Sequence, residues 1–583
     1  MRLMRLFAVA LAASWCFMAP VVAKDGSPIY TYETQFHPKL AKNGMVVSRD
    51  KYASEAGLEI LKEGGNAVDA AVATLFSLAV TLPQAGNIGG GGFMMIYLKD
   101  QDKTIALDYR EIAPKAAFRD MYLNKDGSVD NNRVRFTLKG SGVPGTVMGL
   151  TEALSKYGTL PLKQVMAPAI RLAEQGFPMT WSLNETLKEY KDRLQADPAA
   201  KKYFYKADGS VYAPGEIFRQ PVLAKTLKTI AEKGADGFYK GWVADALVKT
   251  MEEGGGLITH EDLNTYKTFT RKPIIGTYRG YKIATMPPPS SGGVNLIEML
   301  NVLENWPMKS YGLNSAAYIH RLVETMKYAY ADRSKFLGDP AFYDVPVKEL
   351  TSKKYAKSIY NLIDPNKATP SSKIGPAKKL PYESHETTQT SVMDKYGNMV
   401  SNTYTLNYSY GNGHAVMGAG FLLNNEMDDF SAKPGVPNGF GLLGGQANSV
   451  EAGKRPLSSM TPTFIFKPNG EPYIATGSPG GSTIITTVLQ VVLNTIDFGY
   501  NPAAAVSVPR VHHQWYPDRI YMEPGLSVDT RRILVGMGHH VKINSEDSWD
   551  QVLGEAQTLM RGPNHIIMGA ADPRRPGAYA AGF

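Results

Sequence analysis

The sequence predicts a globular protein of mixed α/β class, with helices concentrated in its first part and paired strands after residue 386. Of its 583 residues, 43% are hydrophobic and 20% are charged, which supplies a packed core and excludes a disordered polymer. Helical periodicity recurs in the first part, and an alternating pattern follows a proline-rich stretch. The net charge of +9 is spread along the chain without a nucleic-acid reader motif, so we expect no nucleic-acid partner.

The first 23 residues have the features of a secretory signal peptide. Two arginines precede the apolar stretch 6–20, and small residues follow up to Ala23, where a leader peptidase would cut. The apolar stretch is shorter than the ~20 residues that a membrane-spanning helix needs. The only cysteine, Cys16, lies inside this segment. We therefore expect an exported, periplasmic or secreted protein that has no disulfide after removal of the signal.

Patterns in the next 340 residues predict mostly helices. The segment 66–80 is apolar for about four turns with one aspartate, and we interpret it as a buried helix. The glycines 89–92 run into the apolar stretch 93–98, which is typical of a buried strand. No Gly-Lys-Ser/Thr follows these glycines, so they do not form a phosphate-binding loop. Further helical patterns with regular apolar spacing occupy 146–176, 221–254 and 315–335.

A change of character occurs at residues 363–386. This stretch contains four prolines and no apolar periodicity, so we expect an exposed linker. The alternating segments 388–394 and 399–407 follow it, separated by a Lys-Tyr-Gly-Asn turn. Their pattern predicts a β-hairpin directly after the linker.

Two threonines lie near each other at the mouth of this hairpin. If the turn is centred on Tyr396, Thr387 faces Thr405. A turn centre half a residue later, or a bulge, would shift the pairing by one, so the register stays open. The two hydroxyl groups are close in either case, which is the first arrangement in the chain that suggests chemistry.

Several motifs resemble those of the γ-glutamyltranspeptidases. In chain order they are Asp108-Tyr109-Arg110-Glu111, Ser141–Thr146, Pro287–Gly293, Thr387–Val392 with Thr405-Leu406-Asn407, Leu422–Asn425 with Met427–Phe430, Arg455–Met460 and Gly477–Ser482. Their number and order make coincidence implausible. The resemblance covers essentially the whole mature chain. It implies an α/β layered N-terminal-nucleophile hydrolase fold, a four-layer αββα sandwich, made as one precursor that cleaves itself.

The resemblance also divides the chain. It implies a signal peptide (1–23), a large subunit (24–386) and a small catalytic subunit (387–583), which remain together as a heterodimer after autocatalytic cleavage between Glu386 and Thr387. The small subunit would then begin with the nucleophile.

This division has a chemical reason. A threonine hydroxyl holds its proton and needs a nearby base, and the amino group that cleavage frees on Thr387 has an ordinary pKa of ~7.7–8.0. The resemblance assigns Thr405 to orient the nucleophile. It assigns the backbone N–H groups of Gly480 and Gly481 to the oxyanion, since glycine permits a close approach.

A γ-glutamyl substrate carries a carboxylate and an ammonium group at one end, so its site needs both charges. Arg110 offers the planar fork that binds a carboxylate, and Ser458 and Ser459 resemble the family's hydroxyl donors to the same group. The positions that match the ammonium side are Asn407, Glu426 and Asp429, which can accept its protons.

Three departures limit what the resemblance implies. Gln389 stands where most members have histidine, and Glu426 where many bacterial members have glutamine. Within the loop 431–441, Phe440 replaces a tyrosine that closes over the substrate as a lid in many bacterial members. The preferred acceptor and the balance between hydrolysis and transfer therefore stay open.

Other classes fit the sequence less well. The motif Ser48–Lys51 matches the S-x-x-K of penicillin-binding proteins, but its Lys-Thr-Gly and Ser-Asp-Asn partners are absent. The pairs His512-His513 and His539-His540 lack the spacing of a metal motif. A cephalosporin-type acylase of the same fold and a non-enzymatic periplasmic peptide-binding protein are the alternatives. We expect a γ-glutamyltranspeptidase that uses glutathione, related γ-glutamyl compounds and amino acid or dipeptide acceptors, with no cofactor and no metal.

Overall fold

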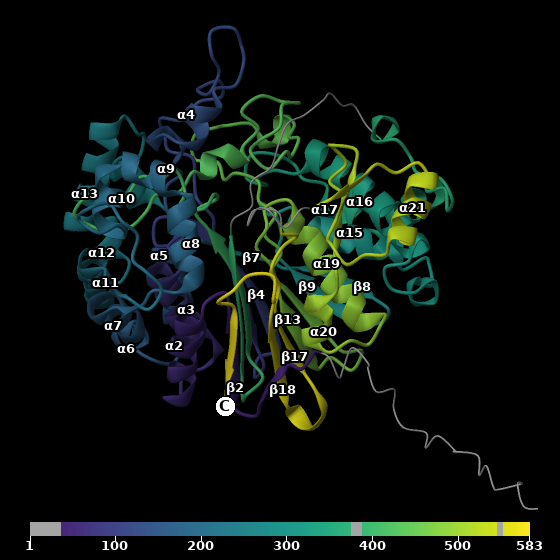
Figure 1. The fold of residues 1–583 in the computed structure, drawn as a ribbon, viewed down its shortest axis with the longest axis horizontal. Coiled ribbons are helices and arrows are strands. Elements are labelled where there is room, and N and C mark those ends of the chain that lie inside the picture. The colour runs from purple at the N-terminus through teal and green to yellow at the C-terminus, as the bar shows by residue number, and fades with distance from the viewer. Residues whose placement is uncertain (1–35, 375–386, 545–551) are drawn as a thin grey trace, which may run out of the picture.

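Two sheets lie face to face in the centre of the protein, and helices cover the outer face of each (Figure 1). The computed structural model describes residues 36–374, 387–544 and 552–583. This four-layer αββα arrangement confirms the predicted fold. The predicted signal segment 1–23 and the predicted cleavage residue Glu386 lie outside the described residues.

The first sheet carries the predicted hairpin in its middle. Its strands in spatial order are β19 (Tyr579–Gly582), β2 (Gly44–Ser48), β10 (Thr388–Asp394), β11 (Met399–Thr405), β3 (Gly91–Leu98), β4 (Lys103–Tyr109) and β7 (Phe269–Arg271). All neighbours are antiparallel. Strands from before residue 386 thus flank β10 and β11 on both sides.

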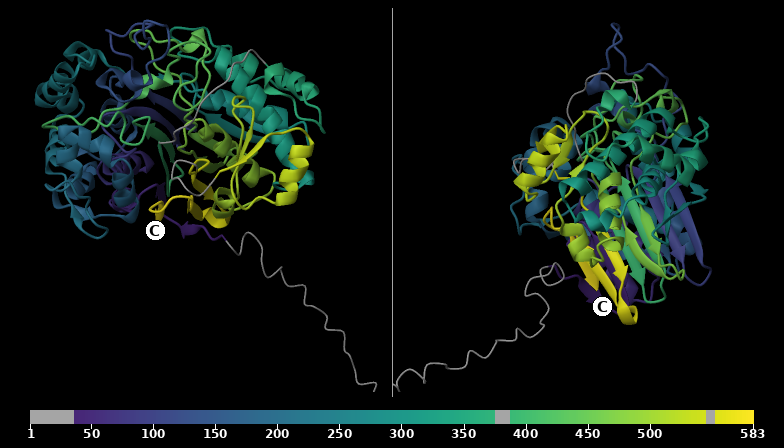
Figure 2. Two further views of the ribbon diagram at one scale, coloured as in Figure 1. Left: turned by 45° about the horizontal axis from the view of Figure 1, so that its top comes forward. Right: turned by 90° about the vertical axis from the view of Figure 1, so that its right-hand side faces the viewer.

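The second sheet mixes the two segments in the same way. Its strands in order are β1 (Lys39–Ala41), β18 (Ile567–Ala571), β17 (Gln557–Arg561), β13 (Pro472–Thr476), β12 (Thr463–Phe466), β9 (Tyr281–Thr285) and β8 (Ile274–Tyr278). Backbone hydrogen bonds in both sheets therefore join the chain before residue 386 to the chain after it. The C-terminus lies at the end of the sheets beside β2 and β18 (Figures 1 and 2).

Strand β3 shows why its sequence is apolar without alternation. Phe93, Met95 and Tyr97 pack between the two sheets, where the Tyr97 ring meets Phe466 edge-on at 4.9 Å. The intervening Met94, Ile96 and Leu98 pack against the helices on the other face. A strand that is buried on both faces has no polar side to present.

Helices from the first part of the chain cover the first sheet. They are α2 (Lys51–Lys62), α3 (Ala67–Thr81), α4 (Asn131–Arg135), α5 (Thr146–Tyr157), α6 (Leu162–Val165), α7 (Ala167–Gln175), α8 (Trp181–Glu189), α9 (Lys191–Ala196), α10 (Pro198–Phe204), α11 (Pro221–Lys233), α12 (Asp236–Tyr239), α13 (Gly241–Gly254) and α14 (His260–Thr265), with a two-stranded sheet of β5 (Phe177–Pro178) and β6 (Ile217–Phe218). Every residue of α3 is buried, and Asn66 closes its N-terminus with a capping box. The predicted buried helix is confirmed.

Helices from both parts cover the second sheet. They are α15 (Gly292–Leu303), α16 (Ala316–Phe336), α17 (Val347–Leu350), α18 (Lys353–Leu362), α19 (Thr483–Ile496), α20 (Pro502–Ser507) and α21 (Val528–Gly536), with a small sheet of β14 (Val511–His512), β15 (Ile520–Met522) and β16 (Val541–Ile543). Across the described ranges, we find no helix with the length and apolar character that crossing a membrane requires.

The glycines at the start of β3 allow two strands to lie very close to each other. A Cβ atom on Gly90 would collide with the carbonyl oxygen of Thr405, and one on Gly92 with that of Thr403. These glycines therefore let β3 and its preceding turn lie directly against β11. This contact explains the glycine run that does not form a phosphate-binding loop.

Candidate active site

The hairpin places two threonines opposite each other. Its ladder pairs Thr388 with Tyr404 and continues without a shift to the turn, which confirms the register centred on Tyr396. Thr387 is one residue beyond that pair and therefore opposes Thr405. Strand β11 ends at Thr405 rather than at the predicted 407, because Asn407 adopts φ 76°, outside the range of a strand.

A small cavity lies at this end of the hairpin. Its walls are formed by Thr387, Thr405, Asn407, Glu426, Asp429, Phe440, Leu442, Ser458, Ser459, Met460, Gly481 and Ile484. Apart from Arg110 and Gly480, all predicted catalytic, binding and lid residues line it. The apolar residues Leu442, Met460 and Ile484 also form part of the wall, and of these only Met460 lies in one of the motifs found in the sequence. Residues that are far apart in the chain therefore converge on the two threonines.

Thr405 is held by the turn that follows its strand. Its Oγ1 accepts a hydrogen bond from the backbone N–H of Asn407 at 2.8 Å. The Asn407 side chain in turn donates to the carbonyl oxygen of Asn425 at 2.9 Å. Because Thr405 Oγ1 is an acceptor in this bond, its own hydrogen points to a different partner. A hydroxyl fixed in this way can donate to the neighbouring nucleophile.

Arg110 lies behind the cavity wall and binds two of the wall residues. Its Nη1 donates to Glu426, its Nη2 to Asp429 Oδ2 at 2.5 Å, and its Nε to the Pro456 carbonyl oxygen at 3.2 Å. The predicted carboxylate-binding and ammonium-binding residues are thus paired with each other. Burial raises the pKa of the neighbouring Glu111 to about 7, although Arg110 acts in the opposite direction.

The two predicted oxyanion residues form the loop between β13 and α19. Gly480 has φ 128° and Gly481 has φ 53°, backbone conformations that residues other than glycine rarely adopt. The loop enters the N-terminus of α19, where the helix dipole favours negative charge. Gly481 faces the cavity, whereas Gly480 borders a neighbouring hollow with Arg49 and Glu555.

Phe440 covers one side of the cavity. It is 4% exposed, its ring meets Tyr408 at 5.5 Å, and a Cβ atom on Gly481 would lie 2.5 Å from it. The backbone beside it is anchored as well: Gln514 donates to the Phe440 carbonyl oxygen at 3.2 Å, and the Gly439 N–H donates to Asp428 at 2.9 Å. The loop is therefore fastened through its main chain without a phenolic hydroxyl.

Gln389, which replaces the usual histidine, is bonded within the hairpin. Its Nε2 donates to Ser401 Oγ at 3.0 Å and its Oε1 accepts from Thr403 Oγ1 at 2.6 Å. It does not border the cavity. Its amide links β10 to β11 near Thr387, the predicted nucleophile.

The sequence interpretation missed Arg333, a buried residue of α16. Its Nε donates to Ser291 Oγ at 2.9 Å and its Nη2 to Ser459 Oγ at 3.2 Å. Ser459 is one of the cavity walls. In the sequence, an arginine in the last turn of a helix is indistinguishable from an ordinary capping residue.

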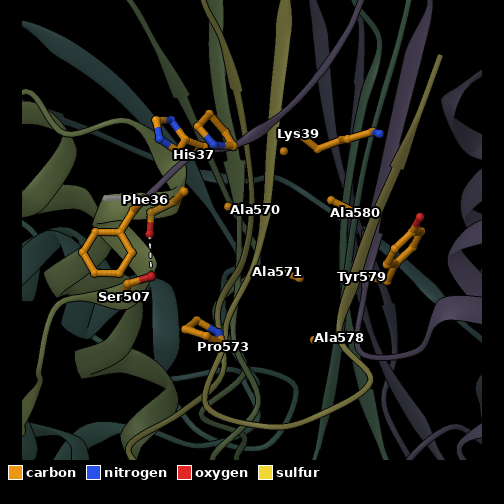
Figure 3. A pocket seen from close by; sticks show the side chains of 13 residues that line it. Phe36, His37, Lys39, Ser507, Ala570, Ala571, Pro573, Ala578, Tyr579 and Ala580 are labelled. Carbon is orange, nitrogen blue, oxygen red and sulfur yellow. Dashed lines mark hydrogen bonds between the residues drawn. The ribbon is translucent and has the colours of Figure 1, made fainter. Parts of the chain in front are cut away.

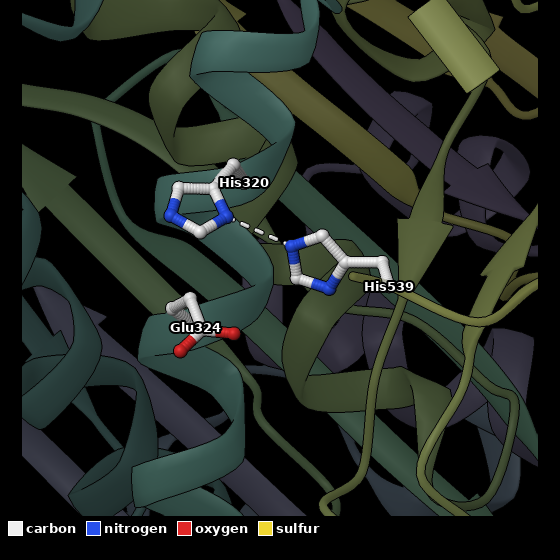
Figure 4. Close-up of side chains that lie close together, drawn as sticks. All are labelled: His320, Glu324 and His539. Carbon is white, nitrogen blue, oxygen red and sulfur yellow. Dashed lines mark hydrogen bonds between the residues drawn. The ribbon is translucent and has the colours of Figure 1, made fainter. Parts of the chain in front are cut away.

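Three side chains away from the cavity have the types that bind metals. Oxygen or nitrogen atoms of His320, Glu324 and His539 lie within 4.8 Å of one another (Figure 4). The two imidazoles are already hydrogen-bonded at 2.8 Å, and Glu324 forms an ion pair with Lys327 at 2.8 Å. Burial lowers the pKa of His539 to about 2. The lysine charge opposes a cation there, so this cluster fits a structural role.

A wider groove lies near the start of the described chain. It is bordered by 36–39 and 569–571, with Ser507 and Tyr579 nearby (Figure 3). Small apolar residues form much of its wall. His37 and Ser507 both line it, but the Ser507 hydroxyl donates to the Ala503 carbonyl oxygen at 2.7 Å within its own helix.

Comparisons with known proteins agree with this geometry. A family model described as gamma-glutamyltranspeptidase matches residues 53–582. The glutathione hydrolase proenzyme of Escherichia coli strain K12 is 50% identical, over 100% of this chain and 99% of that protein. A crystal structure of Helicobacter pylori gamma-glutamyltranspeptidase is 49% identical with a TM-score of 0.55, covering 56% of this chain and 93% of that one. Cephalosporin acylase from Bacillus halodurans has a TM-score of 0.81 at 29% identity, covering 96% and 99%.

The layered fold, in which a threonine directly precedes a central strand, defines an enzyme of the N-terminal-nucleophile hydrolase class. Within that class, the chain belongs to the γ-glutamyltranspeptidase family. The acylase resemblance occurs at lower identity.

Proposed function

We propose that this enzyme transfers γ-glutamyl groups from glutathione and related γ-glutamyl amides to water or to amino acid and peptide acceptors. The observation that carries the proposal is the cavity that joins Thr387 and Thr405 to carboxylates and serine hydroxyl groups in its wall, with the Arg110 guanidinium directly behind that wall. Such a wall matches the zwitterionic end of a γ-glutamyl group rather than the uncharged or singly charged end of most acyl groups.

The internal ion pairs support this substrate class. Arg110 is bound to Glu426 and Asp429. A substrate with one carboxylate and one ammonium group can enter by exchange, in which its carboxylate takes Arg110 and its ammonium takes the two released carboxylates. The number of buried charge pairs rises and no charge is left uncompensated. An acyl group without the ammonium would leave the carboxylates unpaired, which is costly in a buried site.

The catalytic steps follow from the proposed division at residue 386. The free amine of Thr387 takes the proton from its own hydroxyl, whose oxygen attacks the γ-carbonyl carbon. The N–H groups of Gly480 and Gly481 stabilise the oxyanion. The amine returns the proton to the leaving amide nitrogen, and an ester with Thr387 remains. Water or an acceptor amine then attacks the ester and restores the hydroxyl.

The same hydroxyl serves for self-cleavage in this proposal. The two segments 24–386 and 387–583 would stay together because they share both sheets. The relative named proenzyme is also a precursor. The signal-like segment 1–23 supports export to the periplasm.

Incubation with a γ-glutamyl anilide tests the function. Rapid release of the anilide is expected from the transpeptidase alone, whereas a cephalosporin-type acylase would prefer a different acyl group and a peptide-binding protein would release nothing. Faster hydrolysis of glutaryl anilide than of γ-glutamyl anilide would contradict the proposal.

Phe440→Tyr tests the lid. The added hydroxyl should strengthen closure over the ester and raise the ratio of transfer to hydrolysis at a fixed acceptor concentration, since a less firmly closed lid admits water. The change should be modest, at most about tenfold, because one neutral hydrogen bond contributes about 0.5–1.5 kcal/mol and the main chain already anchors the loop. Free glutamate and γ-glutamyl dipeptide would be quantified for both proteins. An unchanged or lower ratio would show that Phe440 does not control water entry.

A further inference from the structure

Arg333 is a buried cation beside the cavity, and within the described residues no carboxylate oxygen lies within 4.0 Å of it, although Asp429 acts on its charge from farther away. Its side chain donates hydrogen bonds to the hydroxyl oxygens of Ser291 and Ser459. Burial lowers its pKa to about 10, so it remains charged at neutral pH. Arg110, by comparison, has the carboxylates of Glu111, Glu426 and Asp429 within 3.6 Å. A buried charge that no carboxylate contacts directly is costly, and a ligand carboxylate nearby would reduce that cost.

The bonds of the two cavity serines fix the direction of their hydroxyl hydrogens. A guanidinium group can only donate, so Ser459 Oγ accepts in its bond with Arg333. Ser458 Oγ likewise accepts, from the backbone N–H of Met460 at 3.1 Å. Among the described residues, neither hydroxyl donates to another protein group. Both hydrogens are therefore available to an acceptor in the cavity that the serines line.

A second bond of Arg333 supports the same segment from the other side. Its Nε donates to Ser291 Oγ, and the hydroxyl and backbone N–H of Ser291 both donate to the Ser458 carbonyl oxygen at 2.7 Å. Ser291 belongs to the motif Pro287–Gly293, for which the reaction itself offers no role. One side chain thus holds the backbone of one serine and the hydroxyl of the next.

We infer that Arg333 is a positioning residue for the α-carboxylate of the substrate: it holds Ser458 and Ser459 as hydrogen-bond donors and supplies a second positive charge on the carboxylate side. The inference rests on the proposed function, since it requires a substrate with that carboxylate. Arg333 acts through the serines, whereas Arg110 would contact the carboxylate itself.

The test is a double-mutant cycle with γ-glutamyl anilide as substrate. Arg333→Gln should raise KM at least about tenfold, the effect of losing one charge-assisted interaction, with kcat changed less than threefold. Combined with Ser459→Ala, the same substitution should raise KM by a clearly smaller factor, because one of the two serines through which it acts has already lost its hydroxyl group. Arg333→Lys keeps the charge but not both bonds, and should show an intermediate KM.

The controls separate positioning from a general structural effect. Arg321 lies on the same helix, where it donates to the Ala317 carbonyl oxygen and stacks on Tyr311. Arg321→Lys should leave KM within twofold. Self-cleavage and thermal unfolding would be measured for each variant to check that it folds. If Arg333→Gln does not fold, Arg333→Lys takes its place in the cycle.

Two results would overturn the inference: an unchanged KM in Arg333→Lys and Arg333→Gln, or an equally large KM effect with and without the Ser459 hydroxyl. Failure of the wild-type protein to release anilide would instead contradict the proposed function.

Discussion

The variant Thr387→Ala should remain a single uncut chain and should release γ-glutamyl anilide at least about a thousandfold more slowly than the wild-type protein. The reason is that, in the proposed mechanism, one hydroxyl performs both attacks, on the bond before residue 387 and on the substrate. Removal of a covalent nucleophile costs at least this much in hydrolases whose catalytic groups act as a unit. Denaturing gels, N-terminal sequencing of the shorter piece and anilide release would be measured together.

The neighbouring threonine provides a matched control. Thr388 is buried in β10, and its hydroxyl makes no hydrogen bond with the described residues. Thr388→Ala therefore makes the same chemical change one residue later, and it should still yield pieces that begin at residue 387. Thr387→Ser keeps the hydroxyl and the amine, so it should cut and retain activity. Cleavage of Thr387→Ala at the same bond would exclude self-cleavage by this residue.

The hairpin could be predicted from the sequence because its information is local. Alternation defines two strands, a four-residue turn joins them, and a turn centred on Tyr396 gives the observed pairing. The end of β11 could not be predicted, since the left-handed conformation of Asn407 depends on contacts with Asn425, 18 residues away. Local patterns thus define the strands, and tertiary contacts define where they end.

The contacts between the cavity residues could not be predicted from the sequence. The types of its polar residues follow from motif resemblance, but their pairing does not. Arg110 and Glu426 are 316 residues apart, and only the shared sheets and the loops at their ends bring them into contact. The same holds for Arg333, whose distinction from a surface arginine is its burial against Ser459. Neither contact can be predicted from the spacing of these residues along the chain.

The pairing changes how the roles of the site residues are understood. The two carboxylates that would bind the ammonium group hold Arg110 in place. The charges of the site therefore fix one another's positions. In the proposed function, the substrate would exchange partners within this network instead of desolvating isolated charges, which would lower the cost of binding a zwitterion in a buried cavity.

Arg110→Lys should lower kcat/KM for γ-glutamyl anilide at least about tenfold. The Arg110 side chain donates to Glu426, Asp429 and the Pro456 carbonyl oxygen from three different nitrogens. Lysine would keep the positive charge but would replace this planar group by a single ammonium nitrogen. A hydrogen bond to a charged group is worth about 1.5–3 kcal/mol, so losing one such bond to the substrate carboxylate accounts for a tenfold effect. Self-cleavage involves no substrate carboxylate and should persist.

Arg271 supplies the control for this substitution. It lies on β7 and forms an ion pair at 2.7 Å with Asp108, which is two residues before Arg110 in the sequence. Arg271 itself does not line the cavity. Arg271→Lys removes the same guanidinium from the same region and should change kcat/KM less than twofold. Kinetics would be measured on cleaved, folded protein, with gels and thermal unfolding as checks. If Arg110→Lys matches the wild-type kinetics, the substrate carboxylate does not bind at Arg110, and the exchange of ion pairs proposed for substrate entry is wrong.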